Sequence, residues 1–159
     1  MLLSLGCTWP DPHSATLEEG ARARAVHAVK GAMAGGRTKI YFDGGCRPNP
    51  GRMEAAVVVR GEAHLFDDMG EGGSFDAEWL ALLEALDLAC RIGLEDVVLL
   101  GDALAVVNEA QAVLDGGLGR EPHATRLREL VAGGPSLRVR WIRRGQNLAG
   151  IALDRRRLR

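Results

Sequence analysis

The sequence has few cysteines, no long apolar run and almost no net charge, and each shortage limits what the protein can be. Three cysteines among 159 residues are too few and too scattered for a disulfide framework or a cysteine-rich zinc site, which favours reduced thiols in a cytoplasm. No window reaches the roughly 18 apolar residues of a membrane span. The first residues lack the basic segment and apolar run of a signal peptide. We therefore expect a cytoplasmic protein that has no membrane partner.

The near-zero charge also limits the choice of partners. A formal net charge of −1 with 47% hydrophobic residues predicts a folded domain, not a disordered chain. It gives no sign of nucleic-acid binding, because strong phosphate binders usually carry a basic excess. The charge is uneven, however, since residues 138–144 and 154–159 are rich in arginine. This basic end is either a solvated terminus or a contact for nucleic acid.

The chain divides in two by composition. Residues 1–36 are rich in alanine, contain helix-start residues and end in Gly-Gly, which predicts a helical N-terminal extension. Residues 37–159 alternate short β-prone runs with longer helical ones, which predicts one α/β domain. Expected strands cover 38–43, 55–61, 63–70, 96–102 and 137–144, and expected helices cover 75–93, 103–114, 121–132 and the segment from 147 onward. This order predicts a mixed five-stranded sheet flanked by helices.

The stretch YFDGGCRPNPG, residues 41–51, brings β-prone residues up to a single aspartate and then follows it with two turn signals in succession. A plain turn needs only one such signal. Asp43 is therefore expected at a strand end, with little side-chain bulk just beyond it. That arrangement suits an acid that contacts a metal ion or a phosphate.

A second acid stands on an apolar helix face. Glu78 is in line with Leu82 and Leu86, at offsets of four and eight residues, so it points toward the sheet. An acid there is paired, neutralised or bound to a metal. The simpler alternative is a first-turn acid that the helix dipole favours.

A third acid, Asp102, ends the run VVLLGD, which is apolar on both faces like a covered parallel strand. Open α/β sheets usually place their sites at this edge, although an aspartate here could also simply cap the next helix. Carboxylates from two neighbouring strand ends and a crossing helix can converge on Mg²⁺, which takes oxygen ligands. Two such ions can support phosphodiester hydrolysis.

These three segments, in their order and spacing, resemble type 1 ribonuclease H over residues 38 to about 153. The resemblance implies the ribonuclease H-like fold and a Mg²⁺ site, with Mn²⁺ as a possible substitute, formed by Asp43, Glu78 and Asp102. It implies that a loop touches the RNA strand of an RNA–DNA hybrid through Gly44, Cys46 and Asn49. The glycines there would let backbone approach ribose 2′-hydroxyls, which distinguish RNA from DNA.

The sequence also departs from the family pattern. It lacks the basic protrusion of many bacterial members and the histidine of the catalytic loop. The segment WIRRGQN instead resembles a subgroup with an arginine three residues before an asparagine, which implies that Arg144 and Asn147 bind substrate. His64 and His123 are far from this loop in the sequence and are expected on the surface.

The fourth acid of the family is missing from its usual place. Four residues after Asn147 the chain has Ile151, which cannot bind metal, and Gly150 precedes it. The nearest acid is Asp154, about 4.5 Å further along a helix and roughly 60° around it. Asp154 is therefore either the displaced fourth metal ligand or a surface acid that pairs with the terminal arginines.

The resemblance implies a metal-dependent endonuclease that cuts the RNA strand of RNA–DNA hybrids by two-metal-ion chemistry, leaving 5′-phosphate and 3′-hydroxyl ends. The alternative is a ribonuclease H-fold module that binds nucleic acid but cuts weakly or not at all. A related nuclease acting on DNA fits the Gly-Gly-Cys loop less well. A monomer without an organic cofactor is expected.

Overall fold

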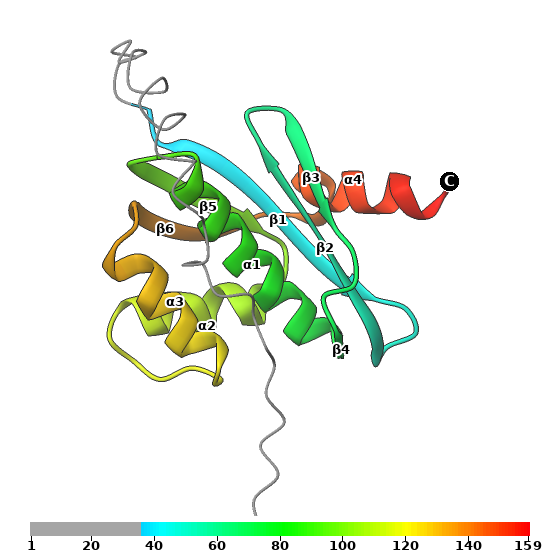
Figure 1. Cartoon of the computed structure of the whole chain (residues 1–159), viewed down its shortest axis with the longest axis horizontal. Coiled ribbons are helices and arrows are strands. Elements are labelled where there is room, and N and C mark those ends of the chain that lie inside the picture. Colours follow the sequence, from blue (N-terminus) through cyan, green and yellow to red (C-terminus); the bar gives the residue numbers. More distant parts are fainter. Residues whose placement is uncertain (1–35) are drawn as a thin grey trace, which may run out of the picture. The chain divides into compact units, whose positions relative to one another are not determined.

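The computed structural model describes residues 36–159. Apart from its last residue, the predicted N-terminal helical extension, 1–36, lies outside this part of the chain. The elements in chain order are β1 (Thr38–Cys46), β2 (Gly51–Val59), β3 (Glu62–Phe66), β4 (Glu71–Gly72), α1 (Ser74–Arg91), β5 (Asp96–Gly101), α2 (Leu104–Leu114), α3 (His123–Ala132), β6 (Ser136–Trp141), the short 3₁₀ turn η3 (Arg144–Gln146) and α4 (Leu148–Arg157) (Figure 1).

The strands form one mixed sheet in the order β3-β2-β1-β5-β6, with β4 paired to β2. β1, β2 and β3 are antiparallel neighbours, whereas β5 runs parallel to both β1 and β6. The predicted mixed sheet is confirmed. The sheet has six strands in the described residues, one more than expected, because the predicted strand 63–70 ends at Phe66. Positive φ angles at Asp68 and Gly70 turn the chain before the two-residue β4.

Helices cover the two faces of the sheet unequally. α1, α2 and α3 pack on one face over the main core, whose largest side chains include Phe42, Trp79 and Leu86. α4 lies behind the sheet on the other face, where Leu153 packs against Ala56 (Figure 1). Among the described residues, no helix is both long and apolar enough to cross a membrane.

The register of the parallel strands brings two predicted acids together. Tyr41 of β1 lies opposite Leu100 of β5. Asp43 and Asp102 stand two residues further along their chains, so both reach the same edge of the sheet. The parallel pairing of β1 with β5 thus assembles the candidate site from residues 59 positions apart.

A close crossing of α1 over β1 brings the third acid to this edge. A Cβ atom at Gly44 would lie 2.1 Å from the carbonyl oxygen of Ala77, so no side chain fits between strand and helix there. The space beside Gly44 is therefore filled by α1. A glycine is needed at position 44 so that α1 can pack on β1, and this role differs from the substrate contact predicted for Gly44.

Two local predictions were wrong. His123 is buried, because its ring stacks on Trp79 at 5.7 Å between centroids and its Nε2 lies 3.1 Å from a carboxylate oxygen of Asp76. Glu78 is not in the first turn of its helix, since α1 begins at Ser74 and the first-turn acid is Asp76. His64 lies half-buried on β3.

Candidate active site

Asp43 is the most deeply buried acid of the site. Its side chain is 1% exposed, and the residue pairs in register with Ala56 of β2. Asp43 was predicted at a strand end, but β1 continues to Cys46 and stays paired with β2. Burial raises the pKa of Asp43 to about 7, with a further increase from the nearby Asp102 carboxylate, although Arg144 opposes the change. A carboxylate in this position is costly to ionise unless a cation neutralises it.

Glu78 reaches the same place from α1. The backbone N–H of Gly44 donates a hydrogen bond to its Oε2 at 3.2 Å, which fixes the carboxyl group against β1. Burial raises the pKa of Glu78 to about 9, and the negative charges of Asp43 and Asp102 add to that increase.

Asp102 directly follows β5 and completes a three-acid cluster. Asp43, Glu78 and Asp102 each place a carboxylate oxygen within 4.8 Å of the others. Asp102 does not cap the next helix, because the N-cap residue of α2 is Ala103 and its cap makes no side-chain hydrogen bond. Three clustered carboxylates, two of them with raised pKa values, form a donor set that suits a hard divalent cation such as Mg²⁺.

Arg144, the first residue of η3, inserts its guanidinium between the acids. It donates to Asp43, to Asp102 at 3.4 Å and to Asp154 at 3.2 Å. Burial opposes the charge of Arg144, but the carboxylates of Asp43 and Asp102 outweigh that effect and raise its pKa. The guanidinium is therefore the cation that balances these acids in this structure.

Asn147 connects three elements of the site by hydrogen bonds. Its side chain is fully buried, and its Nδ2 donates to the carbonyl oxygen of Phe42 at 2.9 Å and to a carboxylate oxygen of Asp102. Its Oδ1 accepts from the N–H of Ala149 at 3.1 Å and so caps α4. One amide thus links β1, the end of β5 and α4.

Asp154 stands apart from the three-acid cluster. Its side chain is half exposed on α4, where it contacts Arg144 on one side and Arg157, at 3.4 Å, on the other. The structure therefore brings together three of the four predicted acids and leaves Asp154 across the guanidinium from them. Ile151, at the position where the family has its acid, is partly buried.

The predicted substrate loop is fastened to α1. Asn49 accepts hydrogen bonds from the N–H of Ser74 at 3.2 Å and from the thiol of Cys46 at 3.4 Å, and its Nδ2 donates to the Ser74 hydroxyl at 3.2 Å. These hydrogen bonds link the turn after β1 to the start of α1.

Two further residues of the site were not predicted. Trp141 is 47% exposed, and its indole N–H donates to the backbone carbonyl of Asp102 at 3.0 Å. Gly150 makes room for Arg144, because a Cβ atom there would lie 2.9 Å from the guanidinium carbon. The sequence indicates a role for Trp141 and Gly150 only through their position on either side of the Arg144–Asn147 segment.

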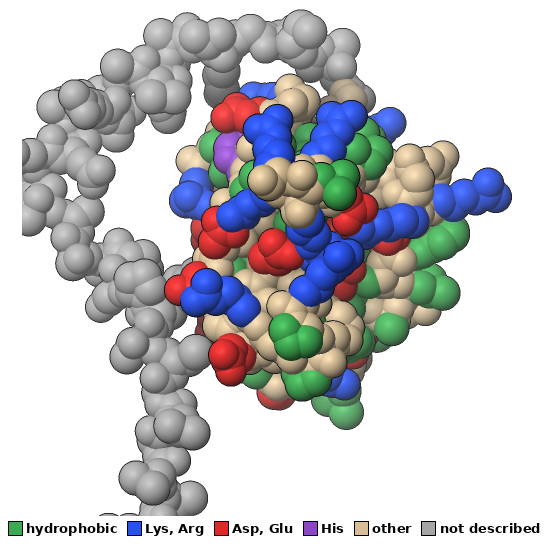
Figure 2. Space-filling model, turned by 90° about the vertical axis from the view of Figure 1, so that its right-hand side faces the viewer, with side chains coloured by type: hydrophobic (Ala, Val, Ile, Leu, Met, Phe, Trp, Pro, Cys, Tyr) green, Lys and Arg blue, Asp and Glu red, His purple; other side chains and the backbone are tan. Residues whose placement is uncertain are grey.

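The basic C-terminal segment is largely balanced by acids. Arg157 pairs with Glu54 at 2.6 Å, and Arg156 pairs with Asp67. Figure 2 shows this side of the domain, with Lys and Arg side chains lying directly beside Asp and Glu side chains. The arginines of α4 are thus tied in part to the sheet and its loops.

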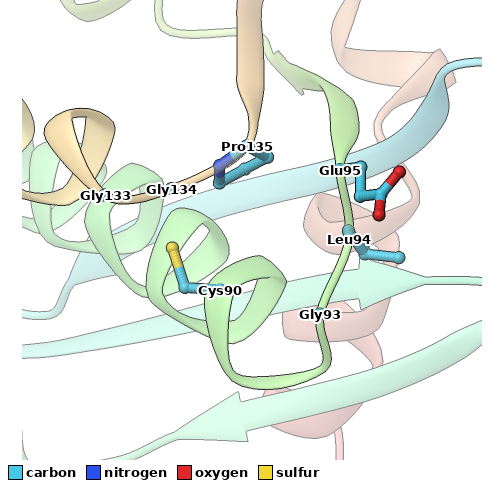
Figure 3. Close-up of a pocket in the computed structure, with 7 residues that line it drawn as sticks. All are labelled: Cys90, Gly93, Leu94, Glu95, Gly133, Gly134 and Pro135. Atoms are coloured by element: carbon cyan, nitrogen blue, oxygen red, sulfur yellow. The ribbon is translucent and has the colours of Figure 1, made fainter. Parts of the chain in front are cut away.

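A separate pocket lies away from the acids. It has a volume of about 330 Å³ and is lined by residues of the turn after α1 and the turn before β6 (Figure 3). None of the predicted site residues lines it. Its lining residues are Cys90, Gly93, Leu94, Glu95, Gly133, Gly134 and Pro135.

Comparisons with known proteins agree with this geometry. A family described as reverse transcriptase-like matches residues 41–155. Ribonuclease HI of Halobacterium salinarum is 32% identical over 149 residues, covering 86% of this chain and 74% of that protein.

Solved structures are similar as well. The crystal structure of RNase H1 from Halobacterium salinarum has a TM-score of 0.61 at 29% identity, covering 76% of this chain and 99% of that one. The structure of LC11-RNase H1 in complex with RNA/DNA hybrid has a TM-score of 0.57 at 26% identity, covering 70% of this chain and 89% of that one.

Proposed function

Because this chain belongs to the type 1 ribonuclease H family and is a ribonuclease H-type endoribonuclease, we propose that it hydrolyses the RNA strand of RNA–DNA hybrids with divalent metal ions. The observation that carries the proposal is the convergence of Asp43, Glu78 and Asp102 within 4.8 Å at one edge of the sheet. A similar protein, LC11-RNase H1, has been solved with an RNA/DNA hybrid, which supports the same substrate here.

The metal site would hold two ions. Each would be Mg²⁺, for which Mn²⁺ could substitute. Such ions activate the attacking water and stabilise the leaving oxygen. Asp43, Glu78 and Asp102 would hold the first ion. The second would need Asp154 in addition, as the fourth acid.

The chain's own hydrogen bonds prepare these acids. The Gly44 amide fixes Glu78, and Asn147 orients Asp102. Because the pKa of Glu78 is raised to about 9, its carboxyl group holds a proton near neutral pH in the absence of a metal, whereas Asp43, with a pKa of about 7, is ionised there in part. Binding of a divalent cation would release these protons.

The RNA strand would lie against the end of β1, which carries Gly44 and Cys46, and the turn after it, which carries Asn49. One hydrogen of the Asn49 amide is donated to Ser74, and the other has no acceptor within residues 36–159, so it would donate to a ribose hydroxyl. Arg144 would contact the phosphate. Both amide hydrogens of Asn147 have acceptors within the protein, so Asn147 would act on the substrate by positioning Asp102.

Labelled substrates test this function. We expect cleavage of an RNA–DNA hybrid in Mg²⁺ or Mn²⁺, none in EDTA, and none of an RNA duplex or a DNA duplex. Cleavage of DNA alone would contradict the proposal. As part of the same proposal, the enzyme acts as a monomer in the cytoplasm and needs no organic cofactor.

One observation favours a second candidate. Ile151 stands where the family has an acid, and Asp154 lies across Arg144 from the cluster. A chain with only three metal-binding acids would bind hybrids and cut them weakly or not at all. Tight binding of the hybrid without detectable cleavage, in either metal, would favour this binding module over the enzyme.

A further inference from the structure

The guanidinium of Arg144 occupies a position inside the acidic site, not beside it. It contacts Asp43, whose side chain is 1% exposed, and it also reaches Asp102 and Asp154. These contacts span the gap between the three-acid cluster and the separate fourth acid.

Several features hold the guanidinium there. Gly150, in the first turn of α4, leaves the space that Arg144 fills. Asp154 binds it from the far side, and Asp154 is itself held by Arg157, which pairs with Glu54 of β2. The position of Arg144 is therefore fixed by contacts that reach from α4 to the sheet.

A second divalent ion would draw on carboxylates that Arg144 already contacts. It would have to lie between the cluster and Asp154, since that is where carboxylates from both sides can reach it. Arg144 already donates to carboxylates on both sides of this gap. Two cations cannot share such a partly buried place without strong repulsion.

We propose that Arg144 is a built-in competitor of the second metal ion, so that this ion binds only when the guanidinium leaves the acids. The inference rests on the proposed function and adds a means of regulating metal binding at the same site. A phosphate group of the substrate offers the departing guanidinium a new bidentate partner. Loading of the second ion is thereby coupled to the arrival of nucleic acid.

Counting bound ions without substrate tests the proposal. Titration of the full chain with Mn²⁺, followed by calorimetry and by the electron paramagnetic resonance of free Mn²⁺, gives the number of ions and their affinities. In Arg144→Met, which keeps most of the side-chain length but removes the charge, we expect the Kd of the second Mn²⁺ to fall by roughly tenfold or more.

A matched control is the neighbouring Arg143, which is exposed and has no ion pair within residues 36–159. Arg143→Met should bind Mn²⁺ like the wild type. Gly150→Ala is a second variant that keeps the arginine but pushes it away, because the new Cβ would crowd the guanidinium. Like Arg144→Met, it should lower the Kd of the second Mn²⁺.

The possible results separate the two proposals. If Arg144→Met binds the second ion no more tightly than the wild type, while the first ion still binds, the competition is wrong and the proposed function stands. If no variant binds Mn²⁺ at all, both proposals are wrong. Thermal melting of each variant verifies that the change in affinity is measured on folded protein.

Discussion

At the scale of single residues, the carboxyl group of Glu78 shows the largest increase in pKa among the acids of the site. Burial beside Asp43 and Asp102 raises its pKa from 4.5 to about 9. The folded state therefore keeps a proton that the unfolded state releases above about pH 4.5. The stability associated with that proton is fully present below this pH and is lost as the pH rises toward 9.

This shift predicts a pH-dependent effect of Glu78→Gln. Glutamine stays neutral at every pH, as the protonated glutamate does. In EDTA, we expect the free energy of unfolding of the variant, minus that of the wild type, to increase as the pH rises from about 4.5 to about 9. Urea unfolding at several pH values measures this difference. Parallel profiles for the two proteins would mean that Glu78 titrates normally.

A pair of substitutions tests the fourth acid. If Asp154 completes the second metal site, Asp154→Asn should lower the cleavage rate by roughly 100-fold, a loss of about 2.7 kcal/mol of transition-state stabilisation. If it is only a surface acid, Asp154→Asn should be silent and Ile151→Asp should raise turnover. Rates on a labelled hybrid, with circular dichroism as a control for folding, decide between these outcomes.

Residue patterns predicted the three central acids but not their surroundings. Asp43, Glu78 and Asp102 were visible because each breaks an apolar pattern at a strand end or on a buried helix face. The insertion of Arg144 was not visible, since it contacts an aspartate 101 positions away. The stacking of His123 on Trp79 is likewise a tertiary contact between α3 and α1, for which a single sequence carries no periodicity.

At the scale of elements, the crossing of α1 over β1 positions Glu78. Gly44 permits this crossing, so Gly44→Ala should push the helix away from the strand. We expect a loss of about 3 kcal/mol in the free energy of unfolding, typical of overpacking, together with weaker metal binding.

Gly133→Ala is the matched control, because a Cβ atom there would meet nothing within 4 Å. It should change neither property. Equal stabilities of the two variants in urea would show that α1 can shift without cost and that the close crossing is dispensable.

The elements themselves were predicted well, and their boundaries less so. Alternating and helical periodicities identified the strands and helices of residues 37–159 because most of them bury one face. The third strand was predicted to extend to 70 but ends at Phe66, and the two-residue β4 after it was not predicted. The left-handed conformation at Asp68 that separates them is not evident from its residue type. The capping of α4 by Asn147 was also missed, although asparagine is a common cap.

At the scale of the whole molecule, metal binding should be linked to folding. The three clustered acids exist only in the folded domain, so an ion that binds them stabilises it. At a Mg²⁺ concentration 100 times the Kd, the free energy of unfolding should rise by about 2.7 kcal/mol. Thermal melting with increasing Mg²⁺, and its reversal by EDTA, measures this rise.

Asp43→Asn should lose most of this response to Mg²⁺. The same melting temperature with and without Mg²⁺, over the whole concentration range, would contradict the metal site. A shift of equal size in the Asp43→Asn variant would mean that the ions bind elsewhere on the molecule.

The hydrogen bond from Trp141 to the backbone of Asp102 has an optical consequence. The indole is half exposed to solvent and is bonded to the peptide group of a site acid, whereas the other tryptophan of the described residues, Trp79, is fully buried beside His123. Indole emission depends on the polarity and electric field around the ring. Trp141 is thus an intrinsic fluorophore attached to the site, and we expect its emission to change when ions or nucleic acid bind there, without any added label.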